Sequence, residues 1–200
     1  MLTYQTPLRI SNQKLVLVST EARLEAISSN ISTTILIEVH AKFEFLPETL
    51  YLAINILDRF LTVKTMSYQK LQLAGITAMF IAVKYQEVPS PNTAHFKYFA
   101  TSTREDIFRA EQYMLRTLDY NLSYPNPMSF LWRIPKETEF DLGILNLAKY
   151  LMEISLVDHR FIEYLPSQVA AAAVFFAKRI LKRGPWVYPD LDYHSILHPD

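Results

Sequence analysis

The stretch from Tyr68 to Val88 has the most distinctive hydrophobic pattern in the chain. From Leu71 to Val83 almost every residue is apolar or small, and at about 100° per residue the apolar positions fall on all sides of a helix. A helix of this kind is buried all round, and it is shorter than the roughly 20 apolar residues of a membrane span. The pattern therefore predicts a central core helix with other helices packed around it.

Apolar positions at helical spacing, together with prolines and capping residues, predict the other elements. Ser67 and Thr103 stand at expected N-cap positions, and Asp106 completes a capping box with Thr103. Residues 1–27 show no clear pattern. In chain order we expect helices over residues 31–45, 47–61, 68–88, 92–99, 103–118, 126–133, 142–157 and 166–182, with a short turn at 160–164. The sequence thus predicts an all-α fold.

A faint internal repeat predicts two similar halves. LYLAINILD at 50–58 aligns with YLMEISLVD at 150–158, and GITAMFI at 75–81 aligns with AAAAVFF at 170–176. A proline-punctuated link, NLSYPNP, separates the halves, and we place the boundary near Tyr124. We therefore expect an N-terminal segment (1–27) and two helical bundles (28–124 and 125–200). The second bundle has fewer predicted helices, so we expect it to be truncated at its C-terminal end.

Composition and charge exclude several classes of function. The 20 basic and 20 acidic residues give a formal net charge of zero, which argues against the basic patch of a nucleic-acid-binding protein. The chain has no cysteine, which excludes disulfides, thiolate zinc sites and cysteine nucleophiles, and its three glycines are too scattered for a phosphate-binding loop. His194 and His198 are four residues apart but lack an HExxH motif, so we expect no metal site.

Two carboxylates occupy unusual positions on predicted helices. Glu111 falls between Ile107 and Leu115, at the centre of an apolar helix face, where a charge is costly unless it is paired. One interpretation is an internal ion pair, for which Lys84 at the end of the core helix is a candidate partner. The other is a carboxylate poised at a partner surface. Asp58 also borders an apolar face, and there we expect a structural salt bridge.

Five segments taken together resemble the cyclin boxes of a fungal mitotic, B-type cyclin. They are LPETLYLAINILDRF (46–60), KLQLAGITAMFIAVKYQE (70–87), AEQYMLRTLDYNLSYPNPMSFL (110–131), LAKYLMEISLVDHRF (147–161) and YLPSQVAAAAVFFAKRIL (164–181). The resemblance implies two tandem cyclin boxes, each a helical bundle around its third helix. It also implies a regulatory subunit that binds and activates a cyclin-dependent protein kinase at the G2/M transition, in the nucleus and cytoplasm. No catalytic residues, cofactor, nucleic acid or membrane would be involved.

The same resemblance assigns roles to individual residues. In the family, a lysine that ends the third helix and a glutamate on the fifth bind the kinase, and these positions are Lys84 and Glu111 here. This favours the partner-surface interpretation of Glu111. Tyr85, Glu87 and Tyr120 lie where family members also contact the kinase. We therefore expect these five residues to form the kinase-binding site.

The first helix departs from the family pattern. Ser28, Ser32 and Ile35 replace a Met, a Leu and a Trp of the patch that docks Arg-x-Leu motifs of substrates. The rest of that patch is retained at Ile31, Glu38, Leu71 and Gln72. We therefore expect a degraded docking patch and weakened docking of kinase substrates.

Ser29 stands where the family has an Arg that pairs with the carboxylate at position 58. If no other cation reaches Asp58, the substitution Ser29→Arg is expected to stabilise the chain.

The sequence leaves a second class of function open besides kinase activation. Box folds also serve as scaffolds that bind a transcription or other partner without activating a kinase.

Overall fold

The computed structural model describes residues 31–64, 66–88, 103–133, 141–158, 160–161 and 164–183. Within these ranges the regular elements are seven α-helices with no strand, which confirms the predicted all-α class. None of the helices described has both the length and the hydropathy needed to cross a membrane. The predicted helix at 92–99, the residues Ser28 and Ser29, and the pair His194 and His198 lie outside the described residues.

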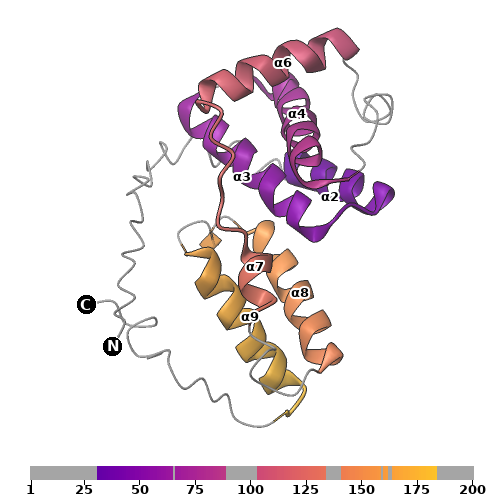
Figure 1. Ribbon diagram of the computed structural model, residues 1–200, viewed down its shortest axis with the longest axis vertical. Coiled ribbons are helices and arrows are strands. Elements are labelled where there is room, and N and C mark those ends of the chain that lie inside the picture. Colours follow the sequence, from indigo (N-terminus) through magenta and orange to yellow (C-terminus); the bar gives the residue numbers. More distant parts are fainter. Residues whose placement is uncertain are drawn as a thin grey trace, which may run out of the picture.

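The helices form two groups that follow one another along the chain (Figure 1). The first group contains α2 (Ile31–Phe43), α3 (Pro47–Val63), α4 (Tyr68–Gln86) and α6 (Arg104–Thr117). The second contains α7 (Pro127–Leu131), α8 (Leu142–Leu156) and α9 (Pro166–Ile180). Each of the seven overlaps a helix predicted from the pattern, and the turn expected at 160–164 begins with a short 3-10 turn at 160–161.

Helix α4 is the core of the first group, as its sequence predicts. All ten residues from Ala74 to Val83 are buried, so the helix has no solvent-facing stripe in this stretch. Helices α2, α3 and α6 pack against it. Its small residues Ala74, Ala78 and Ala82 are almost completely buried, which is consistent with close approach of these neighbours. The charged side chains of α4, Lys70 and Lys84, lie near its two ends, whereas Thr77 in the middle is buried and its hydroxyl donates to the Leu73 carbonyl at 2.7 Å.

The helix ends show which capping residues act. Thr103 caps α6 as predicted, because its hydroxyl accepts from the backbone N–H of Asp106 while the Asp106 carboxylate accepts from the backbone N–H of Thr103. Ser67 occupies the N-cap of α4, but its side chain makes no capping hydrogen bond. Asn126 caps α7 by accepting from the backbone N–H of Met128 at 3.0 Å.

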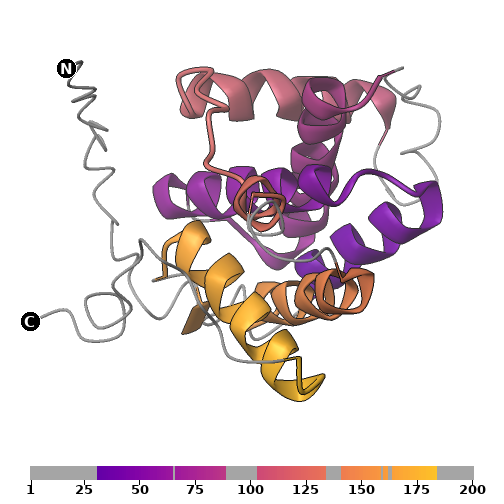
Figure 2. The same cartoon turned by 60° about the horizontal axis from the view of Figure 1, so that its bottom comes forward.

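The second group has its own core, which extends into the first group at α3. Helices α7 and α8 pack against α9, whose buried residues at this core are Ala170, Ala173, Val174 and Ala177. Tyr51 of α3 belongs to the same apolar cluster and is 2 % exposed. The turned view in Figure 2 shows α7 end-on beside α3. The N-terminal half of α3 is therefore one place where the two groups meet.

Two hydrogen bonds fix this meeting point. The Asn126 side-chain amide donates to the backbone carbonyl of Glu48 at 2.9 Å, and the Trp132 indole N–H donates to the Glu48 carboxylate at 3.0 Å. Lys149 of α8 stacks over the Trp132 ring, with its Nζ 4.5 Å from the ring centroid. Glu48, at the start of α3, thus joins α3 to α7 through both its backbone carbonyl and its side-chain carboxylate.

Candidate functional site

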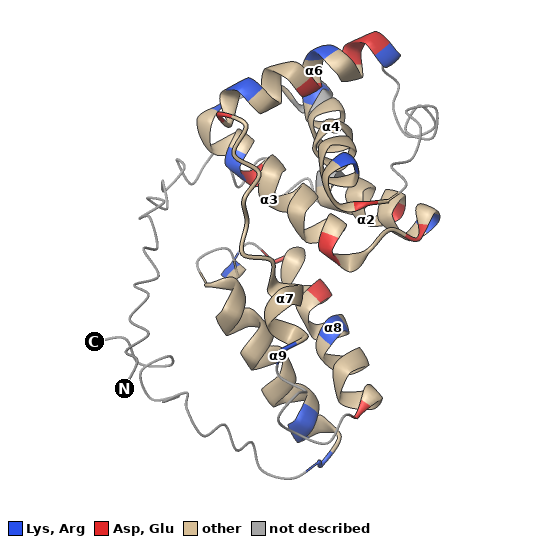
Figure 3. Ribbon diagram, viewed as in Figure 1, with Lys and Arg blue, Asp and Glu red and all other residues tan. Residues whose placement is uncertain are grey.

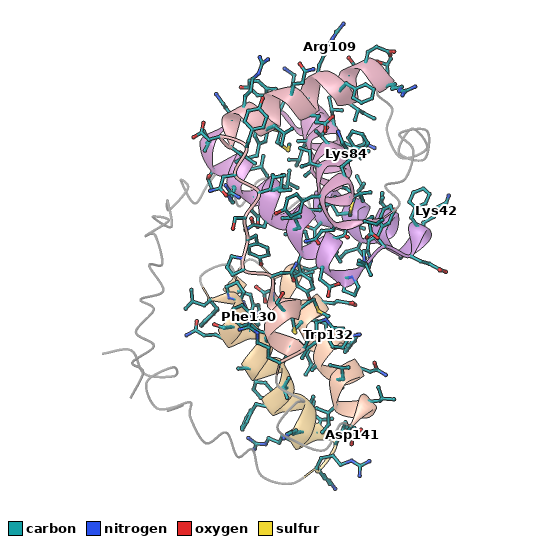
Figure 4. The ribbon with its side chains drawn as sticks, viewed as in Figure 1. Lys42, Lys84, Arg109, Phe130, Trp132 and Asp141 are labelled. Carbon is teal, nitrogen blue, oxygen red and sulfur yellow. The ribbon has the colours of Figure 1, made fainter. Side chains whose placement is uncertain are left out.

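Lys84 and Glu111 form an ion pair between α4 and α6. The Lys84 Nζ lies 2.6 Å from the Glu111 Oε1, and the interaction is a charge-assisted hydrogen bond as well as a salt bridge. The Glu111 side chain is only 9 % exposed, whereas the Lys84 side chain is 47 % exposed. Figure 4 shows Lys84 on α4, with α6 above it in this view. The structure therefore confirms Lys84 as the internal partner of Glu111.

Apolar and aromatic side chains surround this pair. Ile107 and Met114, which flank Glu111 on α6, are buried, so the carboxylate lies in a surround that disfavours a charge without a partner. The Lys84 ammonium lies 5.0 Å from the centroid of the Phe80 ring, and the Phe80 ring meets Phe108 edge to face at 6.0 Å. Within the pair, Glu111 is thus shielded from solvent, whereas Lys84 is partly exposed to it.

Basic and acidic residues are mixed along α6, the helix that carries Glu111. Helix α6 has three basic and three acidic residues, and Figure 3 shows blue and red segments interspersed along it. Among them, Glu111 is the one that is buried. The special feature of this helix is therefore its buried ion pair and not a single-sign surface.

Tyr85 and Tyr120 present exposed aromatic rings near the ends of the same two helices. Tyr85 follows Lys84 in the last turn of α4 and is 59 % exposed, and Tyr120 lies just beyond α6 and is 64 % exposed. Tyr120 and the preceding Asp119 both have positive φ angles, 54° and 51°. The backbone N–H of Tyr120 donates to the Leu115 carbonyl at 2.8 Å, which anchors this left-handed turn.

Glu87 lies close to this site but points to a different part of the first group. Its Oε1 accepts from the backbone N–H of Leu46 at 2.8 Å and from the Thr49 hydroxyl at 2.5 Å. Sequence reasoning missed this contact. The signal that it could have used is Leu46 itself, because leucine at the N-cap of α3 has no acceptor for the first backbone N–H groups of the helix.

The predicted docking patch is partly built into the core. Leu71 is buried, Ile35 packs against the first core, and Glu38 is exposed on α2. Gln72 is half-buried and already engaged in an interaction, and the Ile31 side chain lies outside the described part of the structure. Helices α2 and α4, which carry the two parts of the patch, pack against each other.

Asp58 is half-buried on α3 and is engaged in an interaction in the structure. It also lies near Tyr124, because its charge is the second cause, after burial, that raises the pKa of the Tyr124 phenol. Asp58 is therefore not without a partner. The gain in stability expected from Ser29→Arg applies only if no cation reaches Asp58, and it stays a prediction.

Comparisons with known proteins cover both helical groups. The family model described as the cyclin N-terminal domain matches residues 4–123, and the model of the cyclin C-terminal domain matches residues 125–198. The G2/mitotic-specific cyclin-B of Emericella nidulans is 56 % identical over 153 residues, which are 76 % of this chain and 32 % of that protein. The chain spans about a third of the length of the curated relatives it matches.

Solved structures show the same fold at low sequence identity. A viral cyclin from herpesvirus saimiri superimposes with a TM-score of 0.72 at 18 % identity, covering 82 % of this chain and 72 % of that one. A chain of the yeast RNA polymerase II CTD kinase CTDK-1 complex gives a TM-score of 0.60 at 14 % identity, covering 88 % and 61 %. The helical groups described above are thus cyclin domains, and the chain belongs to the cyclin family.

Proposed function

We propose that this chain is a regulatory subunit that binds and activates a cyclin-dependent serine/threonine protein kinase and so controls the G2/M transition. Its similarity to G2/mitotic-specific cyclins supports a role at the G2/M transition. Its likeness in fold to a chain of a solved kinase complex supports a kinase as partner. The chain itself performs no chemistry in this proposal, and the phosphoryl transfer belongs to the kinase.

The Lys84–Glu111 pair is the observation that carries the proposal. A buried carboxylate that is held by one half-exposed lysine keeps strong hydrogen-bonding groups at the protein surface. On binding, the ammonium of Lys84 donates to a carbonyl of the kinase, and the Glu111 carboxylate accepts from one of its N–H groups. A charged pair of this kind inside an apolar surround has the anatomy of an interface hot spot.

The exposed tyrosines extend this site. Tyr85 and Tyr120 are large aromatic side chains with more than half of their surface exposed, and aromatic residues are enriched at the centres of interfaces. The left-handed turn at Asp119 and Tyr120 holds the second ring at a defined place beyond α6. We assign both tyrosines to contacts with the kinase on either side of the Lys84–Glu111 pair.

A pull-down followed by a histone phosphorylation assay tests the function. Recombinant mitotic kinase is expected to bind the chain and to phosphorylate histone only when the chain is present. A variant with Lys84→Glu is the matched control, since it changes one side chain of the site. Binding without any rise in phosphorylation would favour the scaffold class, and absence of binding would overturn the proposal.

The docking patch yields a prediction about substrates. The patch retains Glu38, Leu71 and Gln72, but Leu71 is buried, and Ile35 stands where the family has a larger aromatic ring. Less apolar area is therefore available to an Arg-x-Leu peptide. We expect affinity at least roughly tenfold below that of an intact patch, which corresponds to about 1.4 kcal/mol. Fluorescence polarisation with a labelled Arg-x-Leu peptide measures this, and ordinary affinity would contradict it.

A further inference from the structure

Helix α3 begins without a capping side chain of its own. Its N-cap residue is Leu46, and Pro47 occupies the first helical position. The first N–H groups of a helix need acceptors, and the positive end of the helix dipole favours an anion. The carboxylate of Glu87 meets both needs, since one of its oxygens accepts from the Leu46 backbone N–H and from the Thr49 hydroxyl.

The same residue ends α4. Glu87 is the C-cap of α4, and its backbone N–H donates to the Val83 carbonyl at 2.9 Å. Lys84 lies three residues before it. A single residue therefore closes the helix that carries Lys84 and Tyr85 and, through its side chain, caps the helix that starts at Pro47.

The capped turn of α3 is itself held from the other side. Glu48, which lies between the two donors to Glu87, bonds to Asn126 through its backbone carbonyl and to Trp132 through its carboxylate. Thr49 is completely buried. The end of α4 is thus tied to a turn that is already fixed to α7, so it has little freedom to shift.

We propose that Glu87 is a positioning residue, which holds the last turn of α4 so that Lys84 and Tyr85 face the kinase in the orientation that it recognises. This inference rests on the proposed function. A carboxylate oxygen that already accepts a backbone N–H and a hydroxyl would have to give up these bonds to contact a partner. Because these bonds engage the Glu87 Oε1, we expect Glu87 to act on kinase binding by holding the Lys84–Glu111 site in place.

Thr49 allows a test that separates positioning from contact. Thr49→Val removes one donor to Glu87 at a buried position that no partner can touch, and Thr49→Ser restores the hydroxyl. We expect Thr49→Val and Glu87→Ala each to weaken kinase binding by about three- to tenfold, with Thr49→Ser close to the unsubstituted chain. The double variant Thr49→Val with Glu87→Ala should bind no more weakly than Glu87→Ala alone, because both changes break the same tie.

Two outcomes would overturn the inference. If Thr49→Val leaves the affinity for the kinase unchanged while Glu87→Ala weakens it, then Glu87 contacts the kinase directly. Hydrogen exchange gives a readout that needs no kinase, since the Leu46 amide is expected to exchange faster in Glu87→Ala, and unchanged exchange would show that no tie exists. Failure of the unsubstituted chain to bind kinase at all would instead reject the proposed function, whatever the exchange rates.

Discussion

Individual residues differ in how far the sequence could predict their roles. Glu111 was predictable, because a lone carboxylate at the centre of an apolar helix face demands a partner, and Lys84 was a candidate for it. The role of Glu87 was not predictable, because its Oε1 accepts from two donors that lie 41 and 38 residues away in the chain. The uncapped Leu46 shows that an acceptor is needed, but only the packing of α4 against α3 shows which residue supplies it.

Two buried tyrosines predict how stability depends on pH. Burial raises the pKa of Tyr51 above its ordinary value of 10.0, with the charge of Glu153 as the next cause, and burial likewise raises the pKa of Tyr124, followed by the charge of Asp58. The folded chain therefore holds both phenolic protons more tightly than the unfolded chain does. Their contribution to stability is complete below about pH 10 and is lost progressively as pH rises above that value.

Urea unfolding between about pH 8 and pH 11 measures this effect. We expect the free energy of unfolding to fall above about pH 10 by up to roughly 1.4 kcal/mol per pH unit for each tyrosine. The double variant Tyr51→Phe with Tyr124→Phe is expected to lose most of this slope. Tyr51→Phe alone should not lower stability at neutral pH, because its buried hydroxyl has no hydrogen-bond partner in the part of the chain that the structure describes. An unchanged alkaline slope in the double variant would contradict the account.

At the scale of helices, periodicity predicted which segments are helical better than where they end. The core helix was expected to reach Val88 but ends at Gln86, and the helix expected over 126–133 is confined to Pro127–Leu131. Ends depend on local hydrogen bonds that a pattern does not contain. Ser67 and Thr103 both stand at N-caps, yet only the hydroxyl of Thr103 makes the capping bond.

The capping box of α6 gives a prediction at this scale. The Thr103 hydroxyl accepts from the Asp106 N–H at 3.2 Å, and Thr103→Ala removes this bond. We expect a loss of about 1 kcal/mol in the free energy of unfolding. Thr117→Ala is the matched control on the same helix, because the Thr117 hydroxyl donates back to the Tyr113 carbonyl and caps nothing, so this change should be close to neutral. Equal effects of the two substitutions in chemical denaturation would argue against the cap.

At the scale of the whole molecule, the two helical groups depend on each other through the start of α3. The internal repeat indicated two similar halves, but it contained no information about how they meet. The structure shows that Tyr51 enters the second core while Glu48 bonds to Asn126 and Trp132. The proposed kinase-binding site at the end of α4 is connected to this junction through Glu87.

Titration calorimetry with the mitotic kinase tests the central claim, that Lys84 and Glu111 are the binding centre. We expect Lys84→Glu and Glu111→Lys each to weaken binding by about 2–5 kcal/mol, the usual loss when one member of a desolvated pair is changed. Arg109→Glu, on an exposed position of α6, is the control and should bind almost as well as the unsubstituted chain.

The exchanged variant that carries both Lys84→Glu and Glu111→Lys makes the measurement decisive. It keeps an ion pair between α4 and α6, so it is expected to fold, which circular dichroism can verify, but it presents the opposite charges to the kinase. The account predicts that this folded variant binds at least roughly a hundredfold more weakly than the unsubstituted chain. Unchanged affinity in the exchanged variant and in both single variants would show that the kinase binds elsewhere.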